Sequence, residues 1–262
     1  MLIIGFLSAG MMAGFLAGLF GVGGGIIVVP VLIFAFHLQG VSPEVLTHMA
    51  VGTSLATIIP ASMTSIYSHN QKKGIDWKVC CYLVPGICLG AVPGVTTAVH
   101  ISGNLLQGLF GVIALLIAWR IYQGDYRQLT RNIPGPAQLG ACGGGIGYIS
   151  AILGIGGGIL IVPLLTRYGM AMKRAAGVSS VCGLATSTVG TLVNMLLGHA
   201  NLQLPAGSTG FVYWPAFFGI VLASVPCTRA GVAIAHRLPA NQLHRLFALL
   251  LLVIGLKFII WS

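Results

Sequence analysis

The chain has 262 residues, of which 56% are hydrophobic and only 6% are charged. Water-soluble domains carry charge on about a quarter of their residues, so this composition excludes a soluble protein and predicts an all-α polytopic membrane protein in a lipid bilayer. The net charge of +10 would suit a nucleic-acid partner, but the Lys and Arg residues lie in short loops and form no basic stripe. No nucleic-acid partner is therefore expected.

The first half of the chain predicts five helical segments. Residues 2–20 are apolar and would form a helix about 28 Å long, enough to cross the hydrocarbon of a bilayer. A glycine-rich turn at 21–25 follows, and the helix predicted after it, 26–36, is too short to cross comfortably. Three longer helices are predicted at 43–67, 77–99 and 105–122.

The glycine-rich turn occurs twice. Residues 21–30 read Gly-Val-Gly-Gly-Gly-Ile-Ile-Val-Val-Pro, and residues 154–163, 133 positions later, read Gly-Ile-Gly-Gly-Gly-Ile-Leu-Ile-Val-Pro. Small residues before the turn recur at the same offset, with Gly10, Gly14 and Gly18 matching Gly143, Gly147 and Ala151. Ordered matches of this kind predict a duplication, with a first transmembrane repeat at 1–122, a cytoplasmic linker at 123–136 and a second repeat at 137–262.

Each repeat is predicted to cross the membrane an odd number of times, because its first two helices form a hairpin that returns to its own side. The second repeat must then be inverted relative to the first, giving eight to ten membrane segments of about five per repeat. All but one of the 13 Lys and Arg residues fall in loops on one predicted side, and the exception is Lys257. By the positive-inside rule that side is cytoplasmic, and both termini are expected to face away from it.

The two glycine-rich turns are the predicted solute site. Consecutive glycines at the start of a helix leave backbone N–H groups bare, and a helix N-terminus attracts anions. In inverted-repeat transporters such broken helices meet near the membrane midplane. The predicted ligands of a small anionic substrate are the turn glycines and the hydroxyl groups expected near the starts of the helices beside them: Gly23, Gly24, Gly25, Gly156, Gly157, Gly158, Thr53, Ser54, Ser179 and Ser180.

Further polar side chains recur at helical spacing and are predicted to line a path through the protein: Ser65, Ser187, Thr191 and Asn194. Two plainer interpretations stay open. The glycines could serve the close packing of helices alone. The hydroxyl groups could bond to a carbonyl of the preceding helical turn or to a neighbouring helix.

The membrane-embedded part of the chain lacks the residues for several other chemistries. The acidic residues are Glu44, Asp76 and Asp125, all near loops, so we expect neither a carboxylate proton relay nor a coupling cation site. The six cysteines and seven histidines form no metal-ligand pattern, and no catalytic motif is present. We therefore predict no metal, no cofactor and no enzymatic activity.

The paired motif at 21–30 and 154–163, together with Ala-Val-Gly-Thr-Ser at 50–54, resembles the TauE/SafE family of sulfite and organosulfonate exporters. The resemblance covers nearly the whole chain. It implies a multi-pass protein of the bacterial inner membrane that exports a small sulfur anion, such as sulfite or sulfoacetate, by alternating access. Uptake of another small anion or sulfur metabolite, or a channel-like anion pore, are the alternatives, and a homodimer is a possible assembly.

Overall fold

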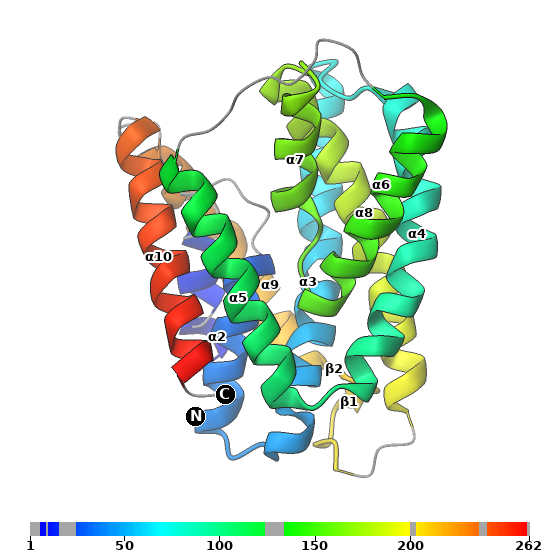
Figure 1. Ribbon diagram of the computed structural model, residues 1–262. Coiled ribbons are helices and arrows are strands. Elements are labelled where there is room, and N and C mark those ends of the chain that lie inside the picture. Colours follow the sequence, from blue (N-terminus) through cyan, green and yellow to red (C-terminus); the bar gives the residue numbers. More distant parts are fainter. Residues whose placement is uncertain are drawn as a thin grey trace.

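The computed structural model describes residues 6–8, 10–15, 25–123, 134–199, 203–235 and 240–260, and most of them are helical. The helices run between two opposite faces of the molecule (Figure 1). After the helical residues 6–8 and 10–15, the elements in chain order are α2 (Gly25–Leu38), α3 (Pro43–Gln71), α4 (Trp77–His100), α5 (Gly103–Gln123), α6 (Pro136–Leu153), α7 (Gly158–Arg167), α8 (Met172–Gly198), β1 (Ser208–Thr209), β2 (Val212–Tyr213), α9 (Trp214–Ala235) and α10 (Ala240–Ile260).

The helix lengths fit a membrane protein. Among the described residues, the stretches long and apolar enough to span a bilayer are α3, α4, the Gly103–Arg120 part of α5, and α8. By contrast, α2 has 14 residues and α7 has 10. These two helices rise only about 21 Å and 15 Å, less than the ~30 Å of hydrocarbon. The predicted all-α polytopic membrane fold is confirmed, and the helix after each glycine-rich turn is short, as predicted.

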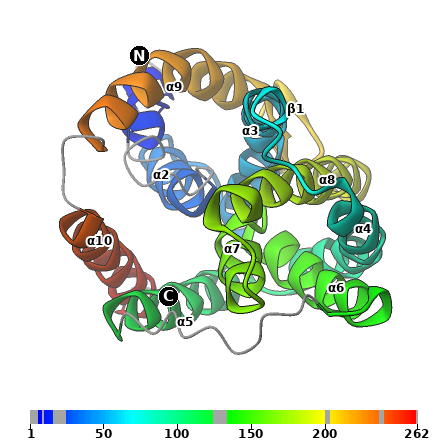
Figure 2. The same ribbon diagram turned by 90° about the horizontal axis from the view of Figure 1, so that it is seen from above.

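Helices α3 and α8 pack against each other near the centre of the molecule (Figure 2). Every residue of α3 from Val45 to Ile58 is buried, so this half of the helix is surrounded by protein on all sides. The other half of α3 is largely exposed, and Tyr67 is 68% exposed. The buried half of α3 is therefore the part around which the rest of the fold is built.

Glycines bring α4 and α6 into backbone contact. A β-carbon on Gly86 or Gly90 would overlap the carbonyl oxygen of Gly140 or Gly144 on the facing helix. Close approach of this kind is what small residues at four-residue spacing provide between membrane helices. These glycines therefore serve packing.

The short helical segment at 10–15 packs in the same manner on α9. A β-carbon on Gly10 would lie 2.7 Å from the Cα of Ile220, and one on Gly14 would lie 2.5 Å from the Cα of Ser224. The segment at 10–15 and helix α6 thus each pack through their glycines against a long helix from the other half of the chain, α9 and α4 respectively. These contacts join the two halves of the chain, and the duplication and its inversion stay predictions. The predicted linker lies mostly outside the described residues.

A small hairpin between α8 and α9 was not predicted. Strand β1 pairs antiparallel with β2, and Gly207 and Gly210 adopt φ angles of 90° and 55° that let the chain turn there. The ring of Tyr213 packs on Phe6 and Phe36, with ring centroids 5.7 and 5.8 Å away. The hairpin is thereby packed into the lower side of the molecule in Figure 1, next to the buried half of α3.

Basic residues gather on the upper face of Figure 1, where α3 and α7 end and where α4 and α8 begin. On the other face, Lys257 in the last turn of α10 lies over the ring of Phe34 at 5.1 Å from its centroid. The described basic residues at the upper helix ends and loops are Lys72, Lys73, Lys78, Arg120, Arg167, Lys173 and Arg174. The distribution follows the charge pattern read from the sequence, and the orientation in the membrane stays a prediction.

Candidate functional site

The last residue of the first glycine-rich turn packs against the second turn inside the protein. Figure 1 shows α2 running downward and α7 running upward from about half-way between the two faces. A β-carbon on Gly25 would lie 3.0 Å from the Cα of Ile155 and 3.3 Å from the carbonyl oxygen of Gly154. Gly23 and Gly24 lie outside the described residues. The structure therefore brings the end of the first turn into direct contact with the second.

The second turn is built from left-handed glycines. Helix α6 ends at Leu153, and Gly154 then takes a φ of 68° and Gly157 a φ of 71°. Side chains other than glycine rarely adopt this conformation. The sequence Gly-Ile-Gly-Gly-Gly thus lets the chain reverse direction within four residues and start α7 at Gly158.

The N–H groups in this turn fall into two sets. Those of Gly154 and Ile155 cap α6, with Ile155 donating to the carbonyl of Ser150 at 3.0 Å. The next four, in residues 156–159, make no hydrogen bond within the part of the chain that the structure describes, and the bonds of α7 start with Leu160 and Ile161 donating to Gly157. Unpaired N–H groups at a helix start carry the positive end of the helix dipole.

One buried hydroxyl group lies beside Gly157 in this turn. Ser150 is 0% exposed, and its Oγ has no hydrogen-bond partner. This oxygen lies 3.3 Å from where a β-carbon on Gly157 would stand. Within the described residues, the start of α7 therefore combines several unpaired backbone donors with one unpaired hydroxyl group.

The hydroxyl groups predicted on α3 are already hydrogen-bonded. Ser54 donates to the carbonyl of Gly154 at 2.9 Å, and Thr53 accepts from the N–H of Tyr213 at 3.0 Å. Both residues lie more than two turns into α3 rather than at the start of a helix, which corrects their expected position. In this conformation Ser54 holds the second glycine turn, and Thr53 holds the hairpin.

The predicted residues of α8 are buried except for the half-buried Ser180, and their hydrogen bonds differ. Ser179 is buried, and Ser180 bonds to the hydroxyl of Ser65 on α3 at 2.7 Å. Ser187 and Asn194 are buried and bond back to carbonyls of their own helix, at 3.1 and 2.8 Å. The Thr191 hydroxyl is buried and has no partner.

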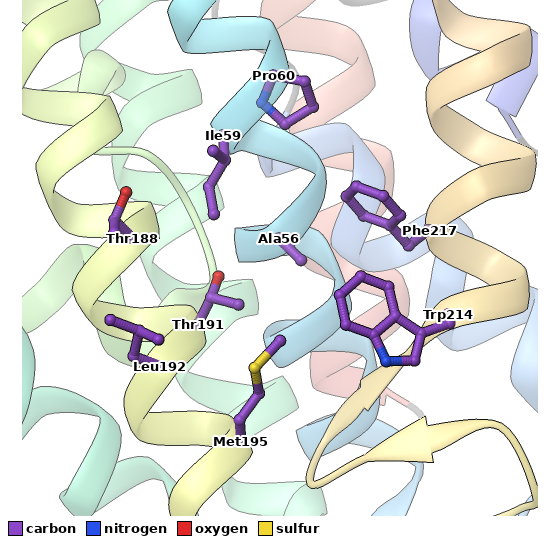
Figure 3. A pocket seen from close by; sticks show the side chains of 9 residues that line it. All are labelled: Ala56, Ile59, Pro60, Thr188, Thr191, Leu192, Met195, Trp214 and Phe217. Carbon is purple, nitrogen blue, oxygen red and sulfur yellow. The ribbon is translucent and has the colours of Figure 1, made fainter.

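A groove of about 220 Å³ runs between α3, α8 and α9 (Figure 3). Its wall contains Thr191 but none of the other predicted site or path residues. Most of its lining is apolar, and only Thr188 and Thr191 among the lining residues carry a hydroxyl group. The apolar lining residues are Ala56, Ile59, Pro60, Leu192, Met195, Trp214 and Phe217. Such a lining offers few hydrogen-bond donors, so this groove does not have the chemistry of an anion site.

The side chain of Ile58 lies between the two glycine turns. Its Cδ1 is 2.8 Å from a β-carbon placed on Gly25, and its Cγ2 is 3.0 Å from one placed on Gly156. Ile58 is 4% exposed and belongs to the buried half of α3. An anion approaching both turns would have to displace this side chain.

Comparison with known proteins places the chain in a family. The family described as Sulfite exporter TauE/SafE matches residues 6–258. The chain belongs to the TauE/SafE family. It is similar to a probable membrane transporter protein of Haemophilus influenzae, 32% identical over 96% of each chain. It is also similar to one of Methanocaldococcus jannaschii, 30% identical over 94% of this chain and 91% of that one.

A further relative is the probable membrane transporter protein YunE of Bacillus subtilis, 26% identical over 95% of this chain and 94% of that one. No solved structure matches the chain. The family and the names of these relatives establish a multi-pass membrane transporter. The predictions of a TauE/SafE protein and of a transporter rather than an enzyme are confirmed.

Two residues of this TauE/SafE protein escaped the sequence analysis. Ser150 lies outside the motif and in the last turn of α6, and Ile58 is one apolar residue among many on α3. No spacing distinguishes either of them. Among the described residues no cluster of three or more His, Cys, Asp or Glu side chains could hold a metal ion.

Proposed function

We propose that this chain exports a small sulfur oxyanion, sulfite or an organosulfonate such as sulfoacetate, across the bacterial inner membrane by alternating access. The observation that carries the proposal is the row of N–H groups at residues 156–159, which make no hydrogen bond within the described residues and directly follow Ile155, a residue that packs on Gly25. Unpaired N–H groups at a helix start can donate to an anion, and the positive end of the helix dipole favours negative charge there. The family's description supports a sulfur oxyanion as that ligand.

Binding by backbone dipoles suits transport. The helix dipole at the start of α7 amounts to about half a positive charge, enough to favour an anion in a medium of low dielectric. A full ion pair would hold the anion too tightly for release on the other side. We propose Gly25, Gly156, Gly157 and Gly158 as the centre of the site, with Gly23 and Gly24 completing the first turn.

The hydroxyl-bearing residues support this centre in two ways. Ser54 fixes the second turn through its bond to Gly154, and Thr53 fixes the hairpin. We propose that Ser179 and Ser180, followed by Ser65, Ser187, Thr191 and Asn194, line the route that opens when α3 and α8 move apart. Movement of Ile58 would then give the anion access to both turns.

The membrane potential can drive export without a coupling ion. A cytoplasm-negative potential pushes an anion outward with about 2.3 kcal/mol per charge per 100 mV. The described carboxylates, Glu44 and Asp76, lie at the first turn of α3 and at the N-cap of α4, away from the site. With the basic face of Figure 1 in the cytoplasm, both termini would face outward.

Purified protein in liposomes provides the test. Vesicles loaded with sulfoacetate and given an inside-negative potential should lose it at a saturable rate, and external sulfoacetate should accelerate the exchange of labelled solute. Unitary currents without exchange would indicate a pore. Transport that ran unchanged at zero potential but stopped without a pH gradient would remove the potential-driven mechanism. Absence of any sulfite or sulfoacetate flux would overturn the proposed substrate class.

A further inference from the structure

The geometry points to Ser150 as a side-chain ligand of the transported anion, at a single oxyanion site on the start of α7. This inference rests on the proposed function and deepens it. The Ser150 hydroxyl is fully buried without a hydrogen-bond partner, and it lies 3.3 Å from the position of a β-carbon on Gly157. It therefore lies beside Gly157, in the middle of the run 156–159 whose N–H groups make no hydrogen bond within the described residues.

The Ser150 hydroxyl group, in the last turn of α6, makes no hydrogen bond within its own helix and is therefore available to a ligand. Serine in a helix commonly donates to the carbonyl three or four residues earlier, as Ser180 does to Ala176 at 3.0 Å. Ser150 makes no such bond, and its own carbonyl is already capped by Ile155. A buried donor left unpaired costs stability unless some state of the protein satisfies it.

The donor set matches a head group with several oxygens. Successive N–H groups at a helix start and a hydroxyl beside them can each donate to a different oxygen of a sulfite or sulfonate group. A halide ion has one acceptor atom and gains less from donors spread over four residues. The donor set accordingly fits an oxyanion head group with several oxygens, such as the sulfite or sulfonate group of the proposed substrate.

The first repeat has no counterpart to this serine. At the offset of 133 residues that relates the two turns, Ser150 corresponds to Ala17. The hydroxyl donor is therefore present in only one of the two glycine turns. The proposed side-chain contact with the anion therefore belongs to the second repeat.

Thermal-shift titration of the full-length purified protein with sulfoacetate tests the assignment. We expect Ser150→Ala to weaken apparent binding roughly tenfold or more, the effect of losing one hydrogen bond to a charged group. Its melting temperature without anion should stay the same or rise, because an unpaired buried hydroxyl is removed. The matched control is Thr186→Val, which removes a 0% exposed hydroxyl group that already bonds to Cys182 at 3.0 Å, and it should bind like the wild type.

The outcomes separate the two proposals. If the wild type binds sulfoacetate and Ser150→Ala binds it equally well, or melts at a lower temperature without any loss of affinity, Ser150 is structural and this inference fails alone. If chloride stabilises the wild type as strongly as sulfoacetate does at equal concentration, the oxyanion head group is wrong. If neither sulfite nor sulfoacetate binds the wild type, the proposed function itself fails.

Discussion

The hydroxyl groups of α3 and the donors at the start of α7 lie within the same small region but differ in what they already bind. On α3, Ser54 donates to Gly154 and Thr53 accepts from Tyr213. Beside α7, the N–H groups of 156–159 and the hydroxyl of Ser150 have no partner in the described part of the chain. A donor can hold a ligand only when it is not already engaged. The comparison gives Ser54 and Thr53 on α3 a structural role in this conformation, and it supports the proposal that the anion binds at the second glycine turn.

The largest expected effect comes from filling the second turn. Gly157→Leu should abolish sulfoacetate efflux from liposomes, because its side chain would occupy the space next to the free donors. The protein should still reach the membrane, since the nearest atoms to a new β-carbon are the Ser150 hydroxyl and the end of Ile161, both at 3.3 Å, and neither is backbone.

Gly40→Leu is the control for backbone strain in this experiment. Gly40 has a φ of 69°, close to the 71° of Gly157, but nothing lies within 4 Å of its β-carbon position. The left-handed strain, about 1–2 kcal/mol, is thus matched while the site is left open. Equal loss of efflux in both variants would show that strain and not the site is responsible.

A glycine that serves packing should behave in the opposite way. Gly90→Leu places a side chain against the carbonyl oxygen of Gly144, which is backbone and cannot move aside. Helices α4 and α6 would have to separate, so we expect most of the protein to be lost from the membrane, as measured by immunoblot and size-exclusion chromatography. Normal amounts of folded but inactive Gly90→Leu protein would contradict this prediction, because a glycine assigned to packing would then behave like one assigned to the site.

The fold could be predicted because membrane helices are encoded locally. Apolar runs and loop charges gave the helix positions, and the start of α3 at Pro43 and of α4 at Trp77 agree with the prediction. The hairpin at 208–213 was missed because its strands have two residues each. A strand that short has no period to detect, and only Gly207 and Gly210 signalled a turn.

The site was predictable only in part. A run of glycines indicates backbone N–H groups that no side chain covers, so Gly156, Gly157 and Gly158 could be named as candidate ligands from the motif alone. Which hydroxyl groups remain unpaired depends on contacts between distant segments, such as the one from Ser54 to Gly154, 100 residues apart. The sequence shows which side chains can donate a hydrogen bond, but it does not show which of them already donate to an acceptor in the folded protein. Ser150 was not recognised as a candidate ligand for this reason.

A smaller effect should follow from trimming the side chain between the turns. Ile58→Val removes Cδ1, the atom 2.8 Å from the β-carbon position of Gly25. We expect a loss of stability of about 0.5–1.5 kcal/mol and a severalfold faster efflux, because less apolar volume must move for the anion to enter. Ile87→Val, at a 0% exposed position in the contact between α4 and α6, should lose similar stability without the gain in rate. Equal rates in the two variants would remove Ile58 as an obstacle.

The smallest functional effect is expected at Ser54, and it tests the comparison most directly. Ser54→Ala breaks the bond to Gly154 and leaves that carbonyl without this donor, which should destabilise the protein by about 1–3 kcal/mol, measured as a lower melting temperature. Once folded, the variant should bind sulfoacetate with an affinity within about twofold of the wild type, because the proposed site holds the anion through the N–H groups of the turn, which remain, and the Ser54 hydroxyl is engaged with Gly154. A tenfold weaker affinity with an unchanged melting temperature would make Ser54 a ligand, and the division between a structural α3 and a binding α7 would no longer hold.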